Sequence, residues 1–295
     1  MSKILSFKQI QSRKYANRQD FQVASEILQE GLTELQDQNI IQGATNYGSF
    51  LENRHTELSD IDAVILNQNP LELISSHIWQ QIMQSFQNYQ IDFSPVIISA
   101  EDISTKRASF SFMQPLKHNT KRWHIGLDPV SLYFDHYSSP DQIRSLTVVI
   151  SDYNRQFIEP LIYHSSLVHN PDPAQTAQLL LSGFKDSYRN LINIHSIQNQ
   201  LEIQNSDLSF DNFQKLFPSL MSTFEYKLLD HVNTFQSEYH RRIQYYIANQ
   251  STFDQELEYN QFLESLIVMA PLVIKFIKQV RAQVLNASTQ LILSS

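Results

Sequence analysis

The chain has 295 residues, a formal net charge of −8 and 42% hydrophobic residues, with 18 Phe and 13 Tyr. These values predict a folded protein with room for two domains and exclude an intrinsically disordered acidic chain. The absence of cysteine excludes a disulfide framework, and the acidic excess disfavours a nucleic-acid polymer as substrate, because proteins that grip a long phosphate backbone usually carry a basic face.

The first part of the chain alternates between helix and strand patterns. Apolar residues at steps of three and four predict a helix over residues 20–38, with Asp20 as its N-cap. A second helix is expected between residues 69 and 89. Strand patterns occupy three segments, 39–49, 60–66 and 89–99. Beyond them, Ser99 is expected to cap a helix, and a loop with an irregular strand is expected up to residue 135.

From about residue 140 the pattern is helical to the end. Apolar periodicity marks four segments, 141–163, 174–197, 210–247 and 261–285, and Pro271 predicts a kink or break in the last of them. We therefore expect an α+β protein: an α/β domain with a small mixed sheet over residues 1–139, and a helical bundle over 140–295. The longest apolar run is too short to span a membrane, and no signal-peptide pattern is present, so we expect a soluble cytoplasmic protein.

Two aspartates lie two residues apart at the start of the 60–66 strand. Because residues i and i+2 of a strand point to one face, Asp60 and Asp62 present their carboxylates side by side. Such a pair is repulsive without a cation, and Mg²⁺ typically takes one or two carboxylates together with substrate phosphates. Asp92 lies in the next strand and joins the pair if the two strands are neighbours. The three carboxylates are then predicted to hold one or two Mg²⁺ ions for phosphoryl transfer, with Asp92 also acting as general base.

Gly48 and Ser49 follow the first strand, in a chain that has only five glycines. Glycine permits close approach of the backbone to a ligand, because it has no Cβ. Ser49 offers a hydroxyl and is expected to open a short helix, whose free N–H groups favour a phosphate. Gly48 and Ser49 are therefore predicted to bind the triphosphate of a nucleotide whose metal the aspartates hold.

The segment YGSFLENRHTELSDIDAVIL, with IDFS downstream, resembles the nucleotidyltransferase superfamily that includes DNA polymerase beta. It is most similar to the small-molecule branch, the aminoglycoside and lincosamide nucleotidyltransferases. The family pattern is Gly-Ser, roughly ten residues, Asp-x-Asp and a hydrophobic strand, with a third acidic residue on a later strand. The matching positions are Gly48, Ser49, Asp60, Asp62 and Asp92. Many members have a glycine four residues after the serine, where this chain has Asn53, which tolerates a left-handed backbone.

The resemblance implies transfer of a nucleoside monophosphate from an NTP, with ATP as the expected donor, to a hydroxyl of a small molecule. An aminoglycoside or similar antibiotic is the implied acceptor, and pyrophosphate is released. We also expect residues 140–295 to form one wall of the acceptor site, since clefts between domains commonly bind small ligands. Two alternatives stay open, because a fold does not fix a function: nucleotidylation of a protein or tRNA, and a non-catalytic nucleotide-binding module. Neither a nucleic-acid polymer nor a membrane is an expected partner.

Each signal taken singly has an ordinary structural explanation. Gly-Ser occurs in many turns, and Asp-x-Asp often marks a solvated turn or strand edge. The basic segment 106–122 is more typical of a solvated loop than of a phosphate contact. Acidic residues after the third strand, such as Asp102 and Asp128, are more typical of surface or capping positions. The prediction of a site rests on the spacing of the two motifs and on the third acidic residue.

Overall fold

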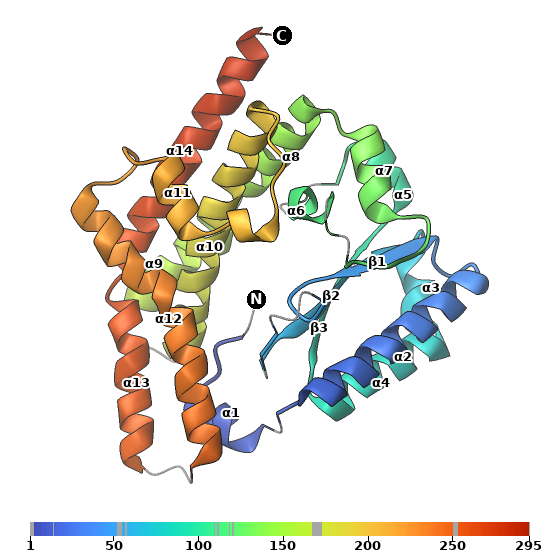
Figure 1. The fold of residues 1–295 in the computed structure, drawn as a ribbon, viewed down its shortest axis with the longest axis horizontal. Helices are drawn as coiled ribbons and strands as arrows, with labels where there is room; N and C mark the ends of the chain where they lie inside the picture. Colours follow the sequence, from blue (N-terminus) through green and yellow to red (C-terminus); the bar gives the residue numbers. More distant parts are fainter. Residues whose placement is uncertain are drawn as a thin grey trace. The chain divides into compact units, whose positions relative to one another are not determined.

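In the computed structural model the chain forms two compact units (Figure 1). The structure describes residues 3–13, 15–51, 55–56, 58–108, 110, 112–117, 119, 121–166, 173–249 and 253–294. The first unit comprises Met1–Lys3 and Arg13–Asp141, and the second comprises Ile4–Ser12 and Gln142–Ser295. The predicted division at residue 140 lies close to this one. Residues 4–12, which the sequence placed in the first domain, belong to the helical unit.

The first unit is built on a mixed sheet of four strands. Its elements are α2 (Arg18–Asp37), β1 (Gly43–Tyr47), β2 (Asp60–Leu66), α3 (Pro70–Ser75), α4 (His77–Tyr89), β3 (Asp92–Ile98), α5 (Ala100–Ser104), α6 (Met113–Lys117), β4 (His124–Gly126) and α7 (Pro129–His136). The strand order is β3-β2-β1-β4. β2 and β3 are parallel, whereas β1 is antiparallel to both β2 and β4. The predicted α+β class and small mixed sheet are confirmed.

The start of α2 differs from the prediction. Asn17 is the N-cap, because its side-chain oxygen accepts hydrogen bonds from the backbone N–H groups of Gln19 and Asp20 at 2.8 and 3.0 Å. Asp20 is the third helical residue, and its carboxylate accepts a hydrogen bond from the Asn17 N–H at 2.8 Å. The two residues form a capping box. Asp20 was the wrong cap because a carboxylate satisfies free N–H groups equally well from inside the first turn.

Two further predictions in this unit need correction. The helix expected over 69–89 is two helices, α3 and α4, separated by Ser76 in an extended conformation. The loop expected before residue 135 contains α6 and α7, and Asp128 caps α7. These helices have 5 and 8 residues, too few for a helical period to be recognised. The predicted Ser99 cap of α5 is confirmed, since its hydroxyl accepts a hydrogen bond from the Asp102 N–H at 2.9 Å.

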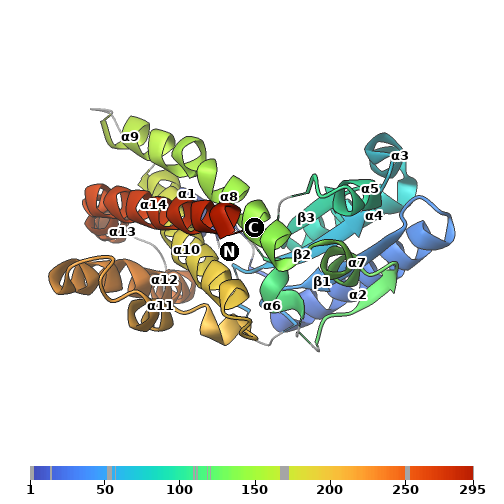
Figure 2. The ribbon, with the colours of Figure 1, turned by 90° about the horizontal axis from the view of Figure 1, so that it is seen from above.

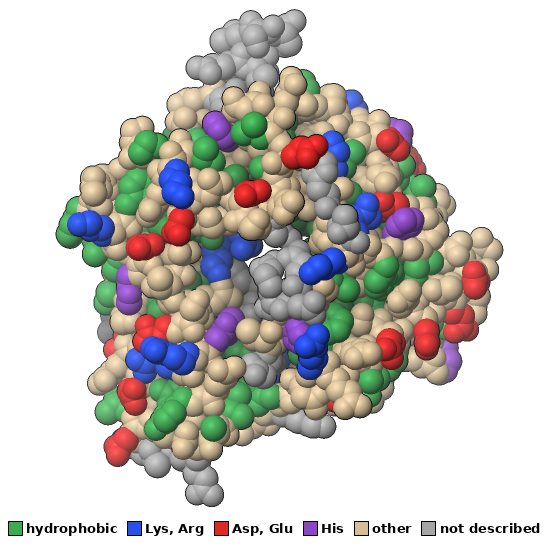
Figure 3. Space-filling model, in the orientation of Figure 1, with side chains coloured by type: hydrophobic (Ala, Val, Ile, Leu, Met, Phe, Trp, Pro, Cys, Tyr) green, Lys and Arg blue, Asp and Glu red, His purple; other side chains and the backbone are tan. Residues whose placement is uncertain are grey.

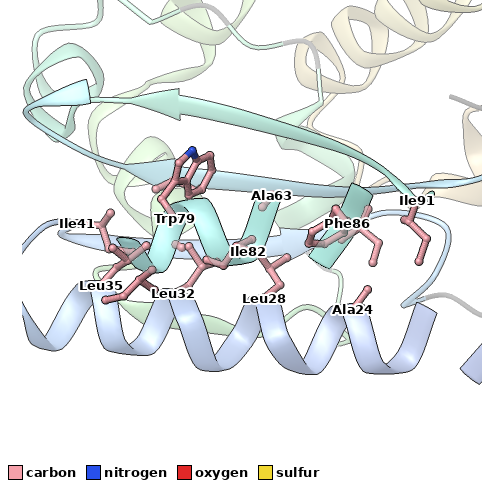
Figure 4. Close-up of a cluster of buried hydrophobic side chains, with 14 of the residues drawn as sticks. Ala24, Leu28, Leu32, Leu35, Ile41, Ala63, Trp79, Ile82, Phe86 and Ile91 are labelled. Carbon is pink, nitrogen blue, oxygen red and sulfur yellow. The ribbon is translucent and has the colours of Figure 1, made fainter. Parts of the chain in front are cut away.

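Helices bury both faces of the sheet. On one face, apolar side chains of β2 such as Ala63 pack against α2 and α4. Figure 4 shows Leu28 and Leu32 of α2 pointing toward Ile82 and Phe86 of α4. On the other face, β2 and β3 pack against residues of α5, α6 and α7, with these strand side chains involved: Val64, Leu66, Val96 and Ile98. β2 is therefore a central strand with apolar residues on both sides, as its near-continuous hydrophobic run predicts.

The second unit is helical throughout its described residues. Its elements are α1 (Phe7–Ser12), α8 (Ser139–Ser151, whose first residues belong to the first unit), a π-helical turn (Asn154–Ile158), α9 (Glu159–Ser166), α10 (Pro173–Gln198), a 3-10 turn (Asn205–Asp207), α11 (Phe210–Leu216), α12 (Thr223–Ala248), α13 (Phe253–Ile267) and α14 (Ala270–Ser294). In Figure 2, α10 and α14 pack against each other. The predicted break near Pro271 is confirmed, because α13 ends at Ile267 and α14 begins at Ala270.

A segment from the start of the chain completes the helical unit. The Leu5 N–H donates to the Tyr239 hydroxyl at 2.8 Å, and the Tyr259 hydroxyl donates to the Leu5 carbonyl at 2.6 Å. The Phe7 ring is buried against the rings of Tyr246 and Tyr259, with centroid distances of 5.5 and 5.8 Å. α1 is thus held by both hydrogen bonds and aromatic packing, which no local sequence pattern indicates.

The exposed face of α2 is acidic, and Figure 3 shows acidic side chains over this helix. The side chains concerned are exposed and follow helical spacing: Glu26, Glu30, Glu34 and Asp37. They lie opposite the apolar stripe that faces α4, as expected of an amphipathic helix. Among the described residues, no helix combines the length and the apolar character needed to cross a bilayer.

Candidate functional site

Two neighbouring strands place three aspartates at one end of the sheet. β2 begins with Asp60, and β3 begins with Asp92. The parallel register pairs Asp60 with Asp92 and Asp62 with Ser94. Since paired residues of neighbouring strands share a face, all four side chains point to the same side of the sheet. The sequence required these strands to be neighbours, and they are.

The end of β1 adds Tyr47 and Gly48 to this region. Tyr47 is the antiparallel partner of Asp62, and its ring stacks on Phe112 with a centroid distance of 5.2 Å. Farther along the strands the same face is apolar and buried under α5 to α7. The carboxylates therefore lie at one end of this sheet face, and the rest of the face is part of the hydrophobic core. The polar site is thus separate from the apolar packing that supports the strands.

Gly48 allows the backbone to pass close to a carboxylate. Its φ of +105° lies in a region that side-chain-bearing residues rarely adopt, and a Cβ built on it would lie 2.5 Å from Asp62 Oδ2. The close approach expected of Gly48 is therefore made to Asp62 within the protein. Ser49 lies in a turn over residues 49–51, where the sequence predicted the start of a helix. Asn53 lies outside the described residues.

The electrostatics of the site are dominated by crowded carboxylates. Burial raises the pKa of Asp62 to about 7, and the neighbouring Asp60 carboxylate contributes to the increase. Burial also raises the pKa of the Tyr47 hydroxyl well above its ordinary range, with Asp62 and Asp60 adding to the effect. A cation beside Asp60 and Asp62 would offset this repulsion, and two carboxylates are a donor set that Mg²⁺ accepts. The pair therefore fits a divalent metal ion.

Asp92 is engaged by a residue that the sequence did not single out. Arg13 Nη2 and Nη1 lie 3.4 and 3.5 Å from Asp92 Oδ2. Asp60 Oδ2 instead accepts a hydrogen bond from the Ser94 hydroxyl at 3.3 Å. Within the described parts of the chain, no three carboxylate or imidazole groups are arranged to hold one metal ion. The structure thus brings Asp60, Asp62 and Asp92 to one end of one face, and pairs the third with a guanidinium.

Ser94 and Arg13 could be found from the sequence to different degrees. Ser94 lies two residues after Asp92 in a strand, so period-two alternation alone would place it on the same face. Arg13 precedes the first predicted helix by several residues and belongs to no motif, so its pairing with Asp92 is visible only in three dimensions.

Two residues of the basic segment after the third strand pair with carboxylates of the protein. Arg122 makes two hydrogen bonds to the Asp128 carboxylate, at 2.8 and 2.9 Å, and is itself mostly buried. Lys106 pairs with Asp141 at 2.6 Å. Asp128 caps α7, as predicted, whereas Asp102 is the third residue of α5 and its N–H donates to the Ser99 cap. Arg122 therefore links the residues before β4 to the start of α7. The other four basic residues of the segment are exposed, as expected of a solvated loop: Lys106, Arg107, Lys117 and Lys121.

No protein-family model matches the chain, and a search of curated proteins gives no match.

Proposed function

We propose that the chain is a metal-dependent nucleotidyltransferase that moves a nucleoside monophosphate from an NTP to a hydroxyl of a small molecule. The acceptor oxygen forms a bond to the α-phosphorus, and the bond from that phosphorus to the β-bridging oxygen breaks, so pyrophosphate leaves with the electron pair. The hydroxyl proton passes to a base of the protein. ATP is the donor and an aminoglycoside or similar antibiotic is the acceptor that we would test first.

Each role that such a reaction requires can be assigned to a residue of the site. Asp60 and Asp62 would hold Mg²⁺, which when bound neutralises charge on the phosphates. Asp92 takes the proton from the acceptor hydroxyl. Gly48 and Ser49, in the turn that follows β1, contact the triphosphate through the backbone and the serine hydroxyl. The observation that carries this proposal is the shared face of Asp60, Asp62 and Asp92, next to Gly48, where a Cβ would collide with the Asp62 carboxylate.

The direct test is pyrophosphate release by the purified full chain. The chain is incubated with Mg²⁺, each of the four common NTPs and a panel of aminoglycosides, lincosamides and other hydroxyl compounds. We expect release that requires both acceptor and metal, that Asp60→Asn abolishes, and that Asp135→Asn, an exposed aspartate of α7, leaves unchanged. Nucleotide binding without release for any acceptor would contradict transfer and favour a binding module. Release only with a cell protein or tRNA fraction would favour a macromolecular acceptor.

A second prediction separates the role of Asp92 from that of the other two aspartates. General-base catalysis typically contributes about 10²–10⁴ in rate, so Asp92→Asn is expected to lower kcat by that factor. The affinity for nucleotide should change much less, because Asp60, Asp62 and the Gly48-Ser49 pair remain. The measurement is kcat together with the nucleotide Kd. Parallel loss of both would make Asp92 mainly a metal ligand, and an unchanged kcat would place the base elsewhere.

A further inference from the structure

Arg13 is positioned as part of the candidate site and not as a solvated surface cation. Its side chain is 14% exposed, whereas that of Asp92 is 43% exposed. Besides the two contacts to Asp92, Arg13 Nη2 donates to the Gln90 carbonyl at 2.6 Å. Gln90 ends α4 in a left-handed conformation, with φ of +54°. A guanidinium held by both a fixed carbonyl and a carboxylate has a defined orientation, which an exposed ion pair commonly lacks.

The Arg13 guanidinium contacts one carboxylate oxygen of Asp92, Oδ2, and not the other, Oδ1. Both Arg13 contacts are made to Oδ2, and among the described residues no hydrogen bond to Oδ1 accompanies them. A carboxylate oxygen accepts through lone pairs in the plane of the group, so fixing Oδ2 also fixes the direction of Oδ1. Arg13 and Asp92 also line a cavity of about 380 Å³ at the start of β3.

Metal binding and the ion pair compete for the same group. A divalent ion that used all three aspartates would need Asp92 to turn from Arg13 toward Asp60, its partner in the register. Breaking a partly buried, hydrogen-bonded ion pair is costly, because the guanidinium is left without its counter-ion. An ion held by Asp60 and Asp62 alone leaves the pair intact.

We propose that Arg13 is a positioning residue that keeps Asp92 out of the metal coordination sphere and aims its second oxygen at the acceptor. This inference rests on the proposed function and goes beyond it, because it names the residue that keeps the base apart from the two metal ligands. Arg13 itself touches neither metal nor substrate in this scheme.

The test is a titration of the full chain with Mn²⁺, followed by electron paramagnetic resonance of the free ion, without nucleotide or acceptor. Asp92→Asn should leave the Mn²⁺ affinity within about twofold, since Asp92 is not a ligand. Arg13→Gln should increase the affinity about tenfold, because the released carboxylate becomes a third oxygen ligand. The double variant Arg13→Gln/Asp92→Asn should return to the affinity of the unmodified chain.

Two controls separate this result from simpler effects. Arg18→Gln removes an exposed positive charge from the same part of the chain and should leave the affinity unchanged. Arg13→Lys keeps the charge but cannot hold the carbonyl and the carboxylate in one planar fork, so an intermediate affinity is expected. The inference is overturned if Asp92→Asn alone weakens Mn²⁺ binding tenfold, if the gain from Arg13→Gln persists in the double variant, or if no variant binds Mn²⁺.

The failure of this inference is distinguishable from that of the proposed function. A chain that follows the expected Mn²⁺ pattern but releases no pyrophosphate would contradict the transferase proposal alone. A chain that releases pyrophosphate with a tenfold loss of Mn²⁺ affinity in Asp92→Asn would contradict the role of Arg13 alone.

Discussion

Replacing Asp62 with asparagine is expected to abolish nucleotidyl transfer while making the metal-free protein more stable at alkaline pH. A neutral amide is a much poorer partner than a carboxylate for a hard dication. Metal stabilisation of the transition state is worth several kcal/mol, so activity should fall by about 10³ or more. The assay is pyrophosphate release at saturating NTP. Activity near that of the unmodified chain would remove Asp62 from the site.

The stability of the same variant should depend on pH in a defined direction. The pKa of Asp62 in the folded protein is about 7, against 3.8 for an ordinary aspartate. The folded state therefore binds the proton more tightly than the unfolded state, and its stability falls as pH rises from about 4 to 7. At pH 8 the ionised carboxylate costs roughly 2–4 kcal/mol. Asp62→Asn should melt at a higher temperature than the unmodified chain above pH 7 in EDTA, and at nearly the same temperature near pH 4.

A charge-matched control makes this prediction specific. Glu30→Gln removes one negative charge from the exposed face of α2, and its melting temperature should follow that of the unmodified chain at every pH. Added Mg²⁺ should raise the melting temperature of the unmodified chain and of Glu30→Gln, but not of Asp62→Asn. A gain for Asp62→Asn that is equal at pH 4 and pH 8 would mean that its carboxylate is not the strained group.

Phe7→Ala is expected to destabilise the helical unit strongly, although residue 7 lies more than a hundred residues from the rest of that unit in sequence. The ring is 3% exposed and contacts Tyr246 and Tyr259. Removing a buried phenylalanine typically costs about 3–5 kcal/mol, which for a unit of this size lowers the melting temperature by roughly 6–20 °C. Scanning calorimetry measures the change.

The neighbouring residue provides the control for Phe7. Lys8 is on the same short helix but is exposed, so Lys8→Ala should change stability by no more than about 0.5 kcal/mol. Limited proteolysis gives a second readout, since Phe7→Ala should expose residues 4–12 to cleavage while Lys8→Ala should not. Equal melting temperatures for the two variants would show that α1 is not an integral part of the helical unit.

The sequence was sufficient where a pattern extends over a whole element. The strand over 60–66 was predicted to the residue. It begins with two aspartates at alternate positions and continues as an unbroken apolar run that includes β-branched residues. Most helices longer than ten residues lie within predicted helical segments. However, the segment 210–247 contains two helices, α11 and α12, and α13 begins at Phe253, before the predicted start at residue 261. The helices α6 and α7 were missed, because their length provides fewer than three turns of periodicity.

The sequence predicted the part of the candidate site that lies on the strands. Asp60, Asp62 and Asp92 follow from alternation and from strand order, and the register then places them on one face. The contact between Gly48 and Asp62, and the pairing of Arg13 with Asp92, join residues that no period connects. Such contacts depend on turn geometry and on where a connecting segment passes, and a single sequence carries no signal for either.

The anchoring of α1 has a consequence for the order of events during protein synthesis. Leu5 is made first, but its hydrogen-bond partner Tyr239 follows 234 residues later. At about 5–20 residues per second, the ribosome needs roughly 10–50 s to supply that partner. The first unit has two cores of its own and is fully translated well within this time. Until the final helices emerge, the nascent chain therefore lacks the partners that bury Phe7 and Ile10 of α1 in the folded helical unit.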